Sequence, residues 1–136
     1  MSAPLYLDSS AVLRAVLEAG TTPEVETRIA DAPLLVTSRL SLVEMSRALM
    51  RVRNAAGVAE RRLADAEREV EAIWARSEVW ELTRDVCELA RTVAPSRSLR
   101  TLDTLHLATF VLARRRIDGL DLLTTDNRLR EAAGVA

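Results

Sequence analysis

Apolar residues follow two different spacings along this chain, and the two alternate. Between positions 38 and 57, Leu42, Met45, Leu49 and Val52 recur every three or four positions, as on the buried face of a helix. Short apolar runs separate such segments and predict strands at 5–8, 33–38, 78–83 and 121–125. The remaining segments predict helices at 10–20, 22–32, 38–57, 58–77, 84–94, 101–116 and 126–134. Strands separated by helices predict an α/β fold of three α/β/α layers, with a short, mainly parallel sheet flanked by helices.

Glycine, proline and threonine residues mark several of the predicted helix ends. We expect Gly20 to end the first helix, and Thr22 with Pro23 to begin the second. Thr101 is the expected N-cap of the helix that follows the break at Pro95. The 136 residues contain no linker, low-complexity tract or internal repeat, so we expect a single domain over 1–136.

Composition limits the ways in which this chain could bind other molecules. Its 19 basic residues, all of them arginine, nearly equal its 20 acidic residues. That balance argues against nucleic-acid binding by overall charge, although local arginine patches remain possible. The few aromatic residues, two tryptophans, one tyrosine and one phenylalanine, do not suffice for a base-stacking platform.

Three features indicate a cytoplasmic protein. Cys87 is the single cysteine, so no disulfide can form within the chain and a reducing compartment is expected. The first residues, MSAPLYLDSS, lack the basic and apolar regions of a signal peptide. No apolar run reaches the roughly 18 residues that a membrane span requires, so we expect no membrane association.

Four acidic residues fall where they could meet at one edge of the predicted sheet. Asp8 ends the first strand, and Asp126 follows the last. Glu44 lies about two turns into the helix after the second strand, and Asp103 in the first turn of the helix before the last strand. Ligands of parallel sheets bind beyond the carboxyl ends of the strands. Carboxylates gathered there remain ionised only beside a positive group, and a hard divalent cation such as Mg²⁺ is suitable. The pattern therefore predicts Mg²⁺- or Mn²⁺-assisted phosphodiester chemistry.

Other kinds of site find no support in the residues. One histidine and one cysteine cannot build a zinc site, and Ser9 and Ser10 have no GxSxG context. Without lysine the chain has no phosphate-binding GxxxxGK[ST] loop, and we expect no small-molecule cofactor.

Four segments, LYLDSSAVL, SRLSLVEMSRAL, LRTLDTLHLATFVLA and LLTTDNRLREAAG, resemble the PIN domain and, more narrowly, the VapC ribonuclease toxins. The resemblance implies a PIN-like fold and a metal-dependent endoribonuclease with Asp8, Glu44, Asp103 and Asp126 as its acidic quartet. Asp8 and Asp103 would bind the metal directly, and Glu44 and Asp126 would complete the pocket, partly through water. Because Asn127 and Arg128 follow the fourth acid, a second metal would bind weakly or only with RNA. The implied products carry 5′-phosphate and 3′-hydroxyl ends.

Alternative explanations exist for three of these four acids. Asp8 could be a turn residue, and Asp103 could be favoured by the helix dipole alone. Glu44 could form an exposed ion-pair ladder with Arg47 and Arg51, although we favour arginines that contact RNA phosphates near the metal.

Some neighbours of the acids are expected to support them. We expect His106 to pack and form hydrogen bonds beneath the acids rather than react. Ser10 and Thr125 could hold an acid or a water molecule, or could act only in capping and strand-end hydrogen bonds. The ARRR run at 113–116 is read as a solvated helix end.

The resemblance also implies partners. These are an RNA substrate, a second copy of the chain in a homodimer, and an antitoxin whose helix occupies a groove and whose basic side chain blocks the acid pocket. Two other functions remain open: a PIN-type RNA-processing nuclease without an antitoxin, and a metal-binding signalling or adaptor domain. The second is disfavoured because receiver-like domains require a lysine after the last strand.

Overall fold

A four-stranded parallel sheet forms the centre of the fold in the computed structural model, which describes residues 2–18, 20, 22–55 and 57–136. Its strands are β1 (Leu5–Leu7), β2 (Leu35–Ser38), β3 (Ser77–Trp80) and β4 (Asp121–Leu123), arranged in the order β3-β2-β1-β4. All three strand pairs are parallel, with Leu7 opposite Thr37 on one side and Leu123 on the other. The predicted α/β class with a parallel sheet is confirmed.

The described residues form helices between and after the strands, and every predicted helix is present. Their bounds are α1 (Ser9–Leu17), α2 (Pro23–Asp31), α3 (Arg39–Asn54), α4 (Glu60–Ala75), α5 (Arg84–Ala90), α6 (Thr101–Arg114) and α7 (Asn127–Ala133). The predicted first and third helices extended to positions 20 and 57, and those segments include positions 19 and 56, which lie outside the described residues. None of the described helices combines the length and apolarity needed to cross a membrane.

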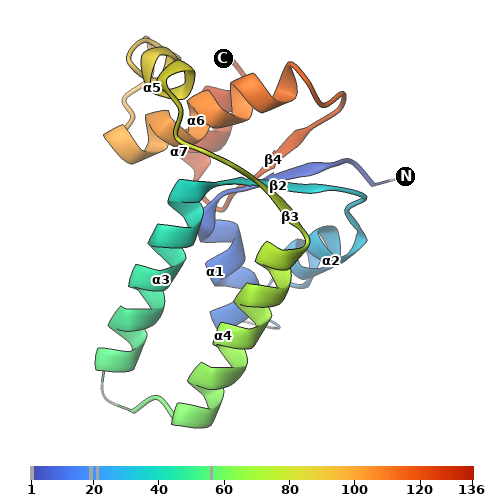
Figure 1. Cartoon of the computed structure of the whole chain (residues 1–136), viewed down its shortest axis with the longest axis vertical. Coiled ribbons are helices and arrows are strands. Elements are labelled where there is room, and N and C mark those ends of the chain that lie inside the picture. Colours follow the sequence, from blue (N-terminus) through green and yellow to red (C-terminus); the bar gives the residue numbers. More distant parts are fainter. Residues whose placement is uncertain (1, 19, 21, 56) are drawn as a thin grey trace.

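Alternating side chains of the strands divide the core between the two faces of the sheet. Leu5 and Leu7 face α1, α2, α3 and α4, whereas Tyr6, between them, faces α6 and α7. In Figure 1 the first group of helices lies below the sheet and α5, α6 and α7 lie above it. This is the predicted three-layer arrangement. Cover on both faces explains why the central strand β1, LYL, is continuously apolar rather than alternating.

Three predictions about helix ends need correction. Helix α1 ends at Leu17, with Glu18 as its C-cap residue, and not at Gly20. Thr101 is not the N-cap of α6 but its first residue, and Arg100 occupies the N-cap position. The carboxylate of Asp103 accepts a hydrogen bond from the Arg100 N–H, so an acid in the first turn does the capping expected of a threonine. Thr22 is the N-cap of α2, but its hydroxyl accepts a hydrogen bond from Arg14 instead of capping the helix.

Strand order determines where a site can form. The chain places β2 and then β3 on one side of β1, and β4 on the other side. The order therefore reverses between β1 and β4, and parallel sheets bind ligands beyond the carboxyl ends of strands at such a point. The Asp8 N–H donates to the Leu123 carbonyl at 3.2 Å, which joins the ends of these two strands.

Candidate metal centre

Asp8 is the buried anchor of the candidate site. It follows β1 in an extended conformation, serves as the N-cap residue of α1, and is only 6% exposed. Ser10 and Thr124 each donate a hydroxyl hydrogen bond to its Oδ2 at 2.7 Å, and the Ser9 hydroxyl lies 3.4 Å from its Oδ1. A buried carboxylate requires such partners, and the hydroxyls of Ser10 and Thr124 both serve its Oδ2.

Glu44 brings a second carboxylate to the same place from α3. Its Oε1 accepts hydrogen bonds from the Ser9 hydroxyl at 3.2 Å and from His106 Nε2 at 2.5 Å. His106 Nε2 is also 3.6 Å from Asp8 Oδ1. One potential ligand atom from each of Asp8, Glu44 and His106 lies within 4.8 Å of the others. We call these three residues the acid–histidine cluster.

His106 forms the buried floor of this cluster. It lies on α6, is 2% exposed, and its Nδ1 is 2.9 Å from the hydroxyl of Tyr6 on β1. Burial by itself lowers the pKa of His106. The hydrogen bond with Glu44 and the nearby negative charges outweigh burial, so the net effect is a raised pKa. A positively charged imidazole would offset part of the charge of the two carboxylates.

The other two predicted acids lie at the edges of the site and cap helices. Asp103 is half-buried one turn before His106 on α6, close enough for its charge to contribute to the raised pKa of that histidine. Asp126 is the N-cap of α7, and its carboxylate accepts the Arg128 N–H at 2.9 Å. The Asp126 N–H donates to the Thr124 hydroxyl, which in turn donates to Asp8. Asp126 is therefore connected to the acid–histidine cluster through Thr124.

Two hydroxyl residues of the site were not found from the sequence. Ser9 lies between the carboxylates of Asp8 and Glu44, and Thr124 donates to Asp8. The sequence analysis instead named Thr125, which contributes its backbone N–H to the Ser10 hydroxyl. The signal for Thr124 was the register: one step beyond the Leu7–Leu123 pair places Thr124 beside Asp8.

A groove leads to the cluster along α1 and α3. It has a volume of about 510 Å³, and its wall includes Ser9, Glu44, Leu102 and two exposed arginines, Arg47 and Arg51. Across the residues that the structure describes, Glu44 makes no ion pair with either arginine. The ion-pair ladder considered for these three residues is therefore wrong, because Glu44 turns inward toward His106. The arginines line the groove as an accessible positive surface.

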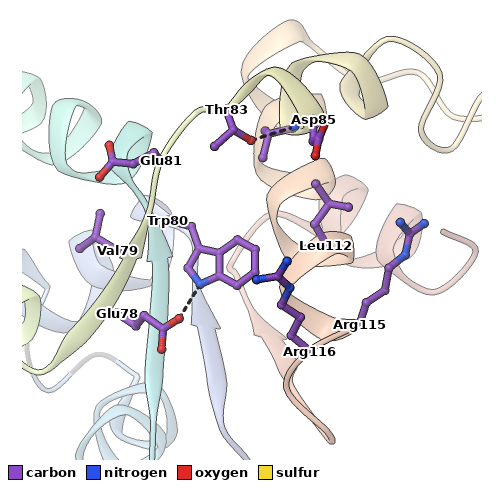
Figure 2. A pocket seen from close by; sticks show the side chains of 10 residues that line it. Glu78, Val79, Trp80, Glu81, Thr83, Asp85, Leu112, Arg115 and Arg116 are labelled. Atoms are coloured by element: carbon purple, nitrogen blue, oxygen red, sulfur yellow. Dashed lines mark hydrogen bonds between the residues drawn. The ribbon is translucent and has the colours of Figure 1, made fainter.

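A second hollow, of about 620 Å³, lies beside β3 and shares no lining residue with the groove (Figure 2). Trp80 donates its indole N–H to Glu78 at 2.9 Å, and the Arg116 guanidinium lies 6.0 Å from the Trp80 ring centre. Arg114 similarly lies over Phe110, at 5.0 Å. The helix end expected to be merely solvated therefore also places the arginines at 114 and 116 over aromatic rings. Glu78, Glu81 and Asp85 line the same hollow, so its charge is mixed.

The chemistry of the acid–histidine cluster fits a divalent cation. Its two carboxylates come from different elements, and hydroxyl groups hold Asp8 in place. Oxygen donors suit Mg²⁺ and Mn²⁺.

Comparison with known proteins places this arrangement in a family. The family model of the PIN domain matches residues 5–135. The chain belongs to the PIN domain family. The resemblance stated from the four sequence segments is thereby confirmed.

The relatives of this PIN protein include ribonuclease VapC45 from Mycobacterium tuberculosis. The two are 32% identical over 133 residues, covering 97% of this chain and 90% of the relative. The solved structure of M. tuberculosis VapC20, a "Sarcin-Ricin loop cleaving toxin", covers 94% of each chain with a TM-score of 0.66 and 19% identity. A toxin–antitoxin complex from Klebsiella pneumoniae covers 90% of this chain and 86% of its own, with a TM-score of 0.63 and 17% identity. At these identities the two structures show the shared fold.

Proposed function

We propose that this PIN protein is a Mg²⁺-dependent endoribonuclease that acts as the toxin of a toxin–antitoxin pair. The observation that carries the proposal is the acid–histidine cluster, in which two carboxylates distant in sequence meet at the strand-order reversal. The names of the relatives, which are ribonucleases and toxins, support the same reaction. A buried carboxylate beside a half-buried one is costly to fold, and divalent-metal chemistry is a use that explains the cost.

Each residue of the site has a role in this proposal. Asp8 and Asp103 would hold the metal directly, while Glu44 and Asp126 complete the pocket, partly through water. Mg²⁺, or Mn²⁺ in its place, would supply positive charge to the phosphate and activate water as the nucleophile. Asp126 or Glu44 would orient that water or accept its proton, and the hydroxyls of Ser10 and Thr124 keep Asp8 in position.

RNA would reach the site through the groove. Arg47 and Arg51 lie along its wall and would contact phosphates, which fix the position of the strand. A chain of nearly balanced charge would thus bind a polyanion through a local positive surface. Attack of water on the phosphate would leave 5′-phosphate and 3′-hydroxyl ends.

The test compares Asp8→Asn and Asp103→Asn with the wild type, and uses Asp118→Asn as a control at an exposed acid remote from the site. We expect Mg²⁺-dependent RNA cleavage and growth arrest on expression to be lost in the first two variants, with circular dichroism unchanged. The control should retain both activities. Cleavage that persists in chelator, or in both site variants, would contradict the proposal.

The proposed partners can be tested separately. We propose one cytoplasmic domain over 1–136 that forms a homodimer and binds an antitoxin encoded beside it. Light scattering after size-exclusion chromatography would measure the dimer, and co-expression with the neighbouring reading frame should suppress growth arrest. RNA cleavage without growth arrest would favour an RNA-processing nuclease, and Mg²⁺ binding without cleavage would favour a signalling or adaptor domain.

A further inference from the structure

Two buried side chains beneath the carboxylates, Tyr6 and His106, have no place in the acidic quartet. We propose that His106, supported by Tyr6, is a positioning residue that holds the Glu44 carboxylate beside Asp8, so that the pocket is assembled before an ion or RNA binds. This inference rests on the proposed function only in naming the ion that the pocket receives. The arrangement of the side chains is independent of the reaction.

The fold places these residues together for a simple geometric reason. Alternation along β1 directs Tyr6 and Asp8 to the same face of the sheet, toward α6. On α6, His106 and Phe110 share the face that contacts Tyr6, with ring centres 6.1 Å and 5.9 Å from the tyrosine ring in edge-on geometry. Tyr6 is 0% and His106 2% exposed, so packing restricts both rings.

Hydrogen bonds then determine the orientation of the imidazole. An ionised carboxylate can only accept, so His106 Nε2 carries the hydrogen of its 2.5 Å bond to Glu44. The Tyr6 hydroxyl forms a hydrogen bond with His106 Nδ1, with 2.9 Å between the two atoms. The imidazole ring therefore cannot turn over without losing its bonds to both Tyr6 and Glu44. Nε2 points at Glu44 whether or not Nδ1 carries a proton.

Glu44 requires this support because it is the more exposed of the two carboxylates. Asp8 is held by the hydroxyls of Ser10 and Thr124 at 2.7 Å. Glu44 has a longer side chain and borders the open groove, and among the described residues its one hydrogen-bond partner besides His106 is Ser9, at 3.2 Å. Two like charges so close together repel, and solvent lies on the groove side. Without His106 we expect Glu44 to turn away from Asp8 into the groove.

The test uses three variants of the full chain, with Mn²⁺ as the probe ion and no RNA. His106→Leu removes both ring nitrogens, His106→Gln keeps an N–H donor near the position of Nε2, and Tyr6→Phe removes only the supporting hydroxyl. Isothermal titration calorimetry measures the Mn²⁺ affinity, and crystal structures of the metal-free proteins show the position of Glu44. Phe110→Leu is the matched control, because Phe110 packs on Tyr6 from the same face of α6 and its side chain carries no hydrogen-bond donor for Glu44.

We expect His106→Leu to weaken Mn²⁺ binding about 10- to 100-fold, as for other residues that orient metal ligands, with Glu44 turned into the groove. His106→Gln should keep most of the wild-type Mn²⁺ affinity, and the loss of affinity in Tyr6→Phe should be smaller than in His106→Leu. Phe110→Leu should lower the unfolding temperature and leave the affinity unchanged. If His106→Leu does not fold, the Mn²⁺ affinity and the position of Glu44 in Tyr6→Phe and His106→Gln test the proposal instead.

Several results would overturn the inference. These are a wild type that does not bind Mn²⁺, an unchanged affinity in His106→Leu, equal losses in His106→Leu and His106→Gln, or Glu44 remaining beside Asp8 in the leucine variant. The proposed function fails in a different way. A wild type that binds Mn²⁺ with this dependence on His106 but cleaves no RNA would refute the nuclease and leave the positioning role standing.

Discussion

Two of the contacts that helix α3 makes between a carboxylate and a positively charged or chargeable group differ sharply in their exposure to water. At its first residue, Arg39 forms a two-pronged ion pair with Glu81, with N–O distances of 3.0 and 2.6 Å. Those side chains are 50% and 59% exposed. One turn later, Glu44 turns inward to His106, whose side chain is 2% exposed, with Asp8 behind it.

The difference shows what each contact contributes. Water and salt screen the exposed pair, so it contributes little to stability despite its good geometry. Water has little access to Asp8 and only partial access to Glu44, so these carboxylates require hydroxyls, an imidazole and a helix end around them. A fold selected for stability alone would place apolar residues there. The buried contact is therefore explained by chemistry, and the exposed one is an ordinary feature of a charged surface.

The largest effect that should distinguish the acid–histidine cluster from the exposed Arg39–Glu81 pair is the stabilisation of the folded protein by a bound metal ion. An ion present at a hundredfold excess over its Kd stabilises the folded state by about 2.7 kcal/mol, which corresponds to a rise of roughly 10 °C in unfolding temperature for a chain of this size. Asp8→Asn should abolish that rise because it removes a ligand. Calorimetry with Mn²⁺ and with chelator measures it. Arg39→Gln should keep the full rise, and a shift that survives in Asp8→Asn would place the ion elsewhere.

A smaller effect is expected from the hydroxyl that links Asp8 with Asp126. Thr124→Val leaves Asp8 Oδ2 and the Asp126 N–H each without one buried partner, which should cost about 1–3 kcal/mol of unfolding free energy. Urea denaturation measures the loss. Thr124→Ser keeps the hydroxyl and should recover most of the stability. Equal losses in the two variants would show that the threonine methyl group, not the hydroxyl, matters.

The smallest effect belongs to the exposed pair, and it depends on pH. The hydrogen bond from Arg39 holds the pKa of Glu81 below its ordinary value. Because the folded pKa is the lower one, the contribution of the pair is complete above the ordinary glutamate pKa and disappears as pH falls through the lowered pKa. Arg39→Gln should therefore shift the urea midpoint slightly at neutral pH and not at all in acid. A shift in urea midpoint as large as that of Thr124→Val, or one that persists in acid or high salt, would contradict the claim that the exposed pair contributes little to stability.

Much of the fold could be predicted because its signals are local. The apolar runs at 5–8 and 121–125 and the helical spacing of Leu42, Met45 and Leu49 predicted the right elements, since strand and helix periods depend on neighbouring residues alone. The errors lie at helix ends, as at Thr101, where the N-cap is Arg100 and the carboxylate of Asp103, three residues after Arg100, accepts its N–H. Element ends depend on single hydrogen bonds that several side chains can make.

The candidate site could be predicted in part. That acids such as Asp8 lie at one edge follows from their positions after strands of a parallel sheet. The hydrogen bonds of Glu44 do not follow, because a glutamate in the second turn of a helix can reach its own arginine neighbours or the sheet edge. Thr124 was missed in favour of Thr125, since a shift of one residue in strand register moves a side chain to the opposite face.

The sequence by itself determined which elements form, that their sheet is parallel, and that carboxylates accumulate at one edge of it. Only the tertiary structure decided that β4 lies beside β1, that Glu44 turns inward, and that His106 with Tyr6 forms the floor of the pocket. The physical reason is range. Helix and strand periods arise within a few residues, whereas the contact between Tyr6 and His106 joins positions 100 residues apart and exists only after the sheet and α6 have packed together.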